Sequence, residues 1–266
     1  MNKILLMIFC LILFSGGCES RMPEEKIIKK EKVTIITVYD NYQVDPGLIT
    51  DWGFSCVVKT DAKTLLFDTG GDSSILLSNM EKMNIDPKDI DIIVLSHIHQ
   101  DHTGGLFGFL ERNRNVKLYI LASFPNSFKE EIKSFGAEYQ EIKESIKISD
   151  QVYTTGELGI WIKEQSLILD TRKGLVIITG CAHPGIANII RRSKELFNKN
   201  VYLVLGGFHL RGASDSELKG IIKEFRDLKV EKVAPCHCSG DRCRELFKEE
   251  YKDDFIKNGV GKRIEI

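Results

Sequence analysis

Residues 96–105 (SHIHQDHTGG) constrain this chain more than any other stretch. Within six positions they place four side chains that can bind a metal, His97, His99, Asp101 and His102. The apolar run 90–95 directly before them is short and β-branched, which predicts a buried strand. Side chains alternate along a strand, so His97 and His99 point to one side, and the following turn carries Asp101 and His102 to a neighbouring position. The spacing therefore predicts two adjacent metal half-sites rather than a polar loop with exposed histidines.

The three other histidines repeat this arrangement. His183, His209 and His237 each follow a β-rich run and lie near glycine. A lone histidine on an apolar face usually packs in a core, but these three positions predict donors carried to one edge of a sheet. We expect His183 to complete the half-site that His97 and His99 begin, and His237 to complete the second. One or two divalent ions are therefore expected, zinc first, with iron or manganese as alternatives.

The order of predicted elements indicates the fold class. Strands are expected at 32–39, 54–59, 64–67, 90–95, 116–121, 167–170, 175–179, 201–205, 232–234 and 260–266, with several short ones within 137–165. Helices are expected at 73–83, 106–112, 127–135, 186–197, 215–228 and 243–251, the fifth of them preceded by a capping box of Ser214 and Glu217. Two sets of strands with interspersed helices, each set ending at histidines, fit an α/β fold, a four-layer αββα sandwich.

The residues 97–102 resemble the signature of the metallo-β-lactamase superfamily, and the chain is similar to its dihydropterin synthase-like branch of metal-dependent hydrolases. The matching pieces cover about five-sixths of the chain. They are Asp40-Asn41-Tyr42, Trp52-Gly53-Phe54-Ser55, Leu66-Phe67-Asp68-Thr69-Gly70, the HxHxDH stretch, Glu164-Gln165-Ser166-Leu167, Thr179-Gly180-Cys181-Ala182-His183-Pro184-Gly185, Gly206-Gly207-Phe208-His209-Leu210 and Pro235-Cys236-His237-Cys238-Ser239-Gly240. The resemblance implies a metallo-β-lactamase-type sandwich over residues 33–266.

The resemblance also singles out a departure at His209. The superfamily commonly places an aspartate between the positions of His183 and His237, where it bridges two metal ions. Residues 201–210 contain no carboxylate, and His209 occupies the relevant turn. Either His209 binds or contacts the centre in that place, which we expect, or the centre has no protein bridge and binds its second metal weakly. Asp101 and His209 are the expected catalytic residues, with Asp101 acting both as a ligand and as a proton acceptor.

Supporting residues are expected beneath the metal ligands. The resemblance favours Asp68 as a carboxylate that orients a ligand histidine, whereas Asp72 is better placed to cap the helix 73–83. Cys181 and Cys236, with Cys238, are expected to be small residues packed under the site, and the alternative is that they supply soft thiolate ligands. The cysteine pattern does not predict a disulfide framework.

The first 32 residues have a different character. Lys3 and the apolar run 4–14 precede Ser15-Gly16-Gly17-Cys18, which resembles the lipobox of bacterial lipoproteins. We expect residues 1–18 to be a signal segment that leaves Cys18 lipidated, and 19–32 to be a charged tether to a membrane surface. The alternatives are a plain signal peptide, an uncleaved anchor, or a cytoplasmic protein whose N-terminal segment is not a signal.

The charge of the chain and the motifs that it lacks exclude several classes of function. The net charge of −1 and the lack of long like-charged blocks argue against nucleic acid as a partner. Gly-x-Ser-x-Gly, Walker and Rossmann glycine patterns are absent. We expect a hydrolase in which a metal-bound hydroxide attacks a small anionic ester or phosphoester, with Arg211 available for the anion. The alternatives are a dihydropterin synthase-type transferase, which an exported location disfavours, and a non-catalytic surface module. Nothing in the sequence predicts an oligomeric state.

Overall fold

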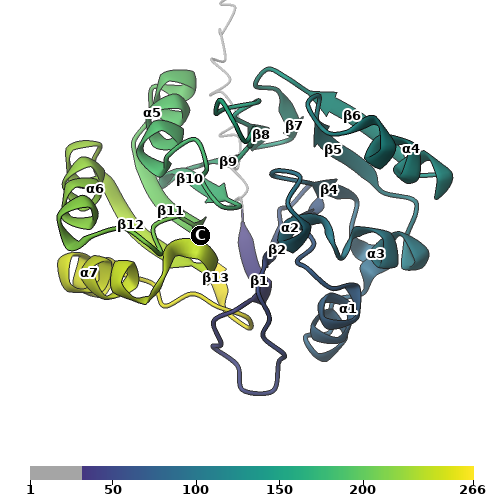
Figure 1. Cartoon of the computed structure of the whole chain (residues 1–266), viewed down its shortest axis with the longest axis horizontal. Helices are drawn as coiled ribbons and strands as arrows, with labels where there is room; N and C mark the ends of the chain where they lie inside the picture. The colour runs from purple at the N-terminus through teal and green to yellow at the C-terminus, as the bar shows by residue number, and fades with distance from the viewer. Residues whose placement is uncertain (1–31) are drawn as a thin grey trace, which may run out of the picture. The chain divides into compact units, whose positions relative to one another are not determined.

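Two β-sheets form the centre of the computed structural model, which describes residues 32–266 (Figure 1). Seven strands form the first sheet in the order β13-β1-β2-β3-β4-β5-β6, and six form the second in the order β12-β11-β10-β9-β8-β7. The strands of the first sheet are β1 (Thr34–Asp40), β2 (Phe54–Lys59), β3 (Thr64–Phe67), β4 (Ile92–Val94), β5 (Lys117–Leu121), β6 (Glu138–Ile142) and β13 (Arg263–Glu265). Those of the second are β7 (Lys147–Ser149), β8 (Val152–Thr154), β9 (Leu167–Thr171), β10 (Gly174–Thr179), β11 (Val201–Gly207) and β12 (Val230–Cys236).

Parallel pairing brings the ends of several strands to one edge of each sheet. In the first sheet β3, β4, β5 and β6 are parallel neighbours, and in the second β10, β11 and β12 are. Their carboxyl ends therefore lie side by side within each sheet, which is where ligand sites form in open α/β sheets. The HxHxDH stretch follows β4, and His183, His209 and His237 follow β10, β11 and β12 in turn.

Helices cover the outer faces of both sheets (Figure 1). On strand β10, Val176 and Ile178 belong to the hydrophobic core between the sheets, whereas Leu175 and Ile177 belong to a second core under helices. This alternation follows from the two-residue period of a strand, because β10 is buried on both faces. The layers run helices, sheet, sheet, helices, which confirms the predicted αββα sandwich. The helices are α1 (Ser73–Lys82), α2 (Gln100–Thr103), α3 (Leu106–Arg112), α4 (Asn126–Ser134), α5 (Ile186–Phe197), α6 (Asp215–Asp227) and α7 (Asp241–Tyr251).

Helix starts follow local capping chemistry. The Asp72 side chain accepts hydrogen bonds from the backbone N–H groups of Ser74 and Ile75 and so begins α1, as predicted. Ser214 and Glu217 form the predicted capping box of α6. Helix α7 begins at Asp241, two residues earlier than predicted, because Gly240 adopts a positive φ of 82° directly before it.

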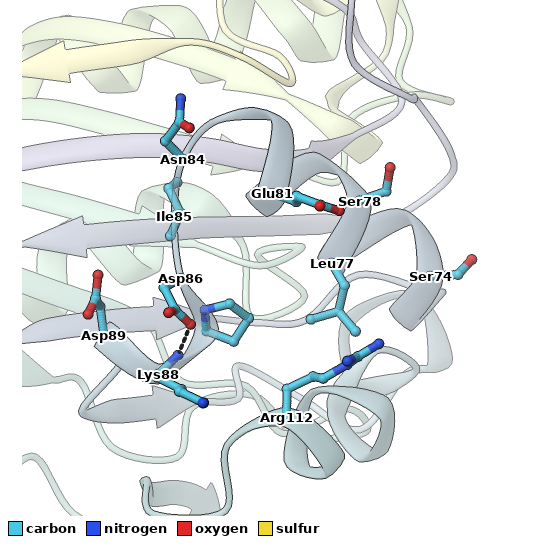
Figure 2. Close-up of a pocket in the computed structure, with 11 residues that line it drawn as sticks. Ser74, Leu77, Ser78, Glu81, Asn84, Ile85, Asp86, Lys88, Asp89 and Arg112 are labelled. Carbon is cyan, nitrogen blue, oxygen red and sulfur yellow. Dashed lines mark hydrogen bonds between the residues drawn. The ribbon is translucent and has the colours of Figure 1, made fainter.

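A surface pocket of about 880 Å³ lies between α1, the short 3-10 helix Pro87–Asp89 and the end of α3 (Figure 2). Its charged lining mixes Glu81, Asp86 and Asp89 with Lys88 and Arg112, and it includes no histidine or cysteine. The 3-10 helix precedes β4, whereas the HxHxDH stretch follows it, so the pocket lies at the opposite end of that strand. It is therefore separate from the candidate site.

The predicted leader 1–18, Cys18 and all of the predicted tether except Lys32 lie outside the described residues. The described residues 32–266 form one compact unit. Within residues 32–266, no helix combines the length and the apolar character needed to cross a bilayer.

Candidate metal centre

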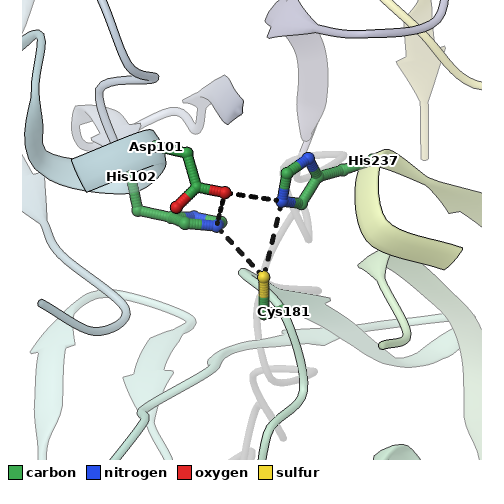
Figure 3. A group of neighbouring side chains, drawn as sticks. All are labelled: Asp101, His102, Cys181 and His237. Carbon is green, nitrogen blue, oxygen red and sulfur yellow. Dashed lines mark hydrogen bonds and ion pairs between the residues drawn. The ribbon is translucent and has the colours of Figure 1, made fainter. Parts of the chain in front are cut away.

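Four donors from three separate segments converge at one point (Figure 3). Cys181 Sγ lies 3.2 Å from His102 Nε2 and 3.4 Å from His237 Nε2, and Asp101 Oδ2 lies 3.3 Å from His237 Nε2 and 3.6 Å from His102 Nε2. A tetrahedral zinc ion with its usual ligand distances separates its donors by roughly 3.3 to 3.8 Å. These four residues, called the four-donor set below, therefore already stand at the spacing of a metal-binding tetrahedron.

Three histidines form a second group beside the four-donor set. His97 Nε2 lies 3.1 Å from His99 Nδ1, and the ring of His183 lies 4.8 Å from that of His97 and 4.9 Å from that of His99. His183 Nε2 is buried and has no hydrogen-bond partner among the described residues. A buried imidazole nitrogen without a partner is costly unless a ligand satisfies it. This three-histidine set therefore also fits a divalent metal ion.

Electrostatics keep His97, His183 and Asp101 in metal-binding form. Burial, followed by the neighbouring histidines, holds the pKa of His97 well below its usual range and lowers that of His183 to about 4. Both rings are thus neutral and have a lone pair free for a cation. Although burial alone would raise it, contacts with His237 and His102 hold the pKa of Asp101 well below its usual range, so this donor is a carboxylate. At His102, although burial alone would lower it, the Asp68 and Asp101 carboxylates raise the pKa to about 9, so a metal ion replaces a proton there.

Asp68 lies beneath both sets, as the resemblance implied. Its carboxylate accepts hydrogen bonds from the backbone N–H of Ser96 at 2.6 Å and from the Ser96 hydroxyl at 2.7 Å, and it contacts His102 Nδ1 at 2.7 Å. The Ser96 hydroxyl also contacts His97 Nδ1 at 2.9 Å. With Nδ1 of each ring engaged, Nε2 is the nitrogen left for a metal, which is the usual role of a carboxylate behind a ligand histidine.

The sequence did not assign a role to Glu164, which holds the loop of His183. Its carboxylate is fully buried and accepts the backbone N–H groups of Cys181, Ala182 and His183 at 2.9, 2.8 and 2.8 Å. Burial raises the pKa of Glu164 to about 7 despite these three bonds. The sequence does place Glu164 shortly before the apolar strand β9. A carboxylate that is buried at such a position needs backbone N–H donors to satisfy it.

Asp40 and Asn41, at the end of β1, hold His237 in a similar way. Asn41 Oδ1 contacts His237 Nδ1 at 3.1 Å, and the Asn41 amide donates to the His237 carbonyl at 3.4 Å. Asp40 accepts the His237 backbone N–H at 3.4 Å. Asp40 and Asn41 lie at the end of a strand, as the HxHxDH stretch does. Their contact with His237, however, joins residues 196 apart in sequence, which no local pattern reveals.

His209 and the cysteines differ in their distance from the centre. His209 is exposed, has a positive φ of 54°, and its ring lies 4.4 Å from that of His183. Cys181 and Cys238 can act as donors with it.

Cys236 is fully buried, accepts a hydrogen bond from the Asn258 amide at 3.3 Å, and belongs to no donor group in the described residues. Cys181 therefore contacts the candidate ligands His102 and His237 directly instead of only packing beneath them. All five cysteines of the described region are free.

A substitution at Gly180 tests how tightly the Ser96–Asp68 pair behind the histidines is packed. A Cβ atom there would lie 2.1 Å from Ser96 Oγ and 2.9 Å from Asp68 Oδ2. We expect Gly180→Ala to lower the free energy of unfolding by about 1 to 3 kcal/mol, because the buried Ser96–Asp68 pair must move. Urea unfolding measures the loss. In the control Gly220→Ala, no atom lies within 4 Å, and the helix position should gain about 0.5 to 1 kcal/mol. Equal stabilities of the two variants would contradict the expectation.

Known proteins share this architecture. Residues 53–195 match the family model described as the metallo-beta-lactamase superfamily. The chain is 30% identical to the 7,8-dihydropterin-6-methyl-4-(beta-D-ribofuranosyl)-aminobenzene-5'-phosphate synthase of Methanocaldococcus jannaschii, over 89% of this chain and 97% of the relative. The crystal structure of Tm1679, a metal-dependent hydrolase of the beta-lactamase superfamily, is similar with a TM-score of 0.73 and 29% identity, covering 88% of this chain and 99% of that one.

A more distant solved structure shows the fold alone. The metallo-beta-lactamase fold protein YhfI of Bacillus subtilis has a TM-score of 0.68 at 12% identity, covering 89% of this chain and 100% of that one. The family match includes the HxHxDH stretch and the loop of His183, which contribute to both donor sets. The family predicted from these motifs is thereby confirmed, and this chain belongs to the metallo-β-lactamase superfamily.

Proposed function

We propose that this protein is a metal-dependent hydrolase of small anionic esters or phosphoesters. The observation that supports this most is the adjacency of the two donor sets, with His99, Asp101 and His183 only partly buried and His209 exposed. Divalent ions bound in such a site activate water and polarise a phosphoryl or carbonyl oxygen. A site open to solvent suits hydrolysis, since a transfer reaction requires that water be kept out.

The chain's own residues have distinct tasks in this reaction. Asp101 carries a carboxylate whose side chain is 22% exposed, so it can accept a proton at the edge of the four-donor set. His209 presents an exposed imidazole next to His183, where it can donate a hydrogen bond to a substrate oxygen. Asp68 and Glu164 do not reach the substrate, and they fix the ligand loops from behind.

Arg211 and Trp52 suggest the substrate's charge. The Arg211 guanidinium lies 5.0 Å from the centre of the Trp52 ring, and Trp52 lies 4.8 Å from the His237 ring. Both side chains are exposed at the rim, so an anionic group can reach them. A guanidinium held over an aromatic face is well suited to bind a phosphate or carboxylate.

We expect Arg211→Ala to raise KM for an anionic substrate about tenfold and to leave kcat within about twofold, because a charge-assisted hydrogen bond of about 1.5 kcal/mol or more is lost. Steady-state kinetics with an anionic and a neutral ester measure the effect. The neutral ester should show no change in KM. Arg192→Ala, which removes a partly exposed arginine on α5, serves as the control, and an equal effect in both variants would contradict the role of Arg211.

Hydrolysis itself is tested with chromogenic phosphodiesters and carboxylic esters. The purified full chain should turn over one of these classes after loading with zinc, manganese or iron, and chelation should abolish the activity. His99→Ala should lose both metal and activity. Full metal loading without turnover of any ester would favour a surface binding module instead.

A transferase of the dihydropterin synthase type is the second candidate. The similarity to the Methanocaldococcus jannaschii synthase, at 30% identity over 97% of that protein, favours it. The test supplies a dihydropterin pyrophosphate with and without an aminobenzene riboside phosphate. Pyrophosphate release that requires the acceptor would support the transferase. Release without the acceptor, or ester turnover alone, would support the hydrolase.

We propose export and a lipid anchor at Cys18 for the location, on the lipobox-like pattern alone. Mass analysis of the N-terminus of the protein isolated from cells tests this. A diacylated Cys18 as the first residue is expected, and an unmodified Met1 would contradict it.

A further inference from the structure

Cys181 occupies an unusual place among the donors. Its sulfur lies within 4.8 Å of the donor atoms of the four-donor set, of His97 and His183 in the three-histidine set, and of His209 and Cys238. Of the described residues, Cys181 alone belongs to all three of these groups. One atom that faces both metal-binding sets is the position that a bridging ligand requires.

The backbone around Cys181 fixes the sulfur there. Glu164 accepts the N–H groups of Cys181 and of the two following residues, so the thiol and His183 are held by one buried carboxylate. Ala182, between them, has a positive φ of 63°, an arrangement that costs free energy for a residue with a side chain. This turn lets the side chains of Cys181 and His183 both face the centre although they are two residues apart.

No carboxylate of the β11 strand or its turn is available for the same place. Residues 201–210 lack aspartate and glutamate, and His209 lies at the exposed rim. Asp101 is a member of the four-donor set, but it belongs to no group with His97 or His183. Cys181 therefore provides the one negatively ionisable atom that both sets share among the described residues.

We propose that the Cys181 thiolate bridges the two metal ions of this centre, which rests on the proposed metal-dependent function. When the ions bind, the S–H bond breaks, the proton passes to solvent and the sulfur forms bonds to both cations.

X-ray absorption of the zinc-loaded Cys238→Ala chain tests the bridge, because this variant leaves Cys181 as the one thiol in the donor groups of the described residues. A thiolate shared by two ions contributes about one sulfur per zinc at about 2.3 Å, whereas a terminal ligand contributes about half of that. Two zinc ions per chain with about one sulfur each are expected. A value near one half, or no sulfur, would overturn the bridge. A chain that binds no metal at all would overturn the proposed function as well, so the two failures are distinguishable.

Cobalt(II) loading of three alanine variants assigns the sulfur to a residue. The wild type and Cys243→Ala, which removes a buried cysteine of α7 outside the donor groups, should both show thiolate-to-cobalt charge-transfer absorption. Cys238→Ala should retain it, and Cys181→Ala should lose it and bind its second ion at least about tenfold more weakly. Loss of the charge-transfer absorption in Cys238→Ala, together with its retention in Cys181→Ala, would overturn the proposal. Circular dichroism confirms that each variant is folded.

Discussion

Replacement of Asp101 by asparagine is expected to lower kcat/KM for ester hydrolysis by about 10³-fold, within the range that a positioned acid or base contributes. The carboxylate stands 3.3 Å from His237 Nε2 and 3.6 Å from His102 Nε2, so it closes the four-donor set. Asparagine has nearly the same shape, but it loses both the negative charge and the capacity to accept a proton. Metal content measured on the same sample separates loss of an ion from loss of proton transfer.

The matched control for this variant is Asp72→Asn. Asp72 is exposed and caps α1, and asparagine caps a helix about as well as aspartate does. Its activity and stability should therefore remain close to those of the wild type. If Asp101→Asn retained more than about a third of the wild-type kcat/KM, the carboxylate would have no catalytic or binding role in this centre.

Glu164→Gln is expected to reduce stability and metal affinity together. The buried carboxylate accepts three backbone N–H groups, and an amide at the same place turns an NH₂ group toward at least one of these donors. We expect a loss of about 3 kcal/mol in the free energy of unfolding, since a buried donor is left without an acceptor. Displacement of the His183 loop should weaken metal binding about 10- to 100-fold, as loss of a support behind a ligand does.

Chemical unfolding of the metal-free chain and competition with a chelator measure the two effects separately. Glu157→Gln is the control, because Glu157 lies in the same connecting segment but accepts a single N–H, that of Ser123, near the surface. It should change stability by less than about 1 kcal/mol and leave metal affinity unaltered. Weakened metal binding in Glu157→Gln to the same extent would contradict a specific role for Glu164.

Short-range sequence patterns predict many of the strands and helix starts of this protein. The apolar run before the HxHxDH stretch predicts β4, and Asp72 and the Ser214–Glu217 pair fix the starts of α1 and α6. These features depend on residues a few positions apart, so their patterns are visible in the chain. The convergence of histidines could be predicted as well, because parallel strands bring their carboxyl ends to one edge.

Tertiary structure alone decided which groups hold the ligands. The Glu164 carboxylate meets a loop 17 to 19 residues away, and Asn41 meets His237 across 196 residues. Neither partner carries a sequence pattern that points to the other. Cys181 was expected to pack under the site, yet its sulfur contacts two histidines of the candidate metal centre, His102 and His237.

The sequence by itself thus determined the strands, the caps and the identity of most donors, since period, capping and strand order are short-range properties. The folded chain decided how the donors divide into two sets, which carboxylates stand behind them, and where the sulfur lies. The physical reason is that a buried polar group takes whichever partner the packing of distant segments brings within hydrogen-bond distance.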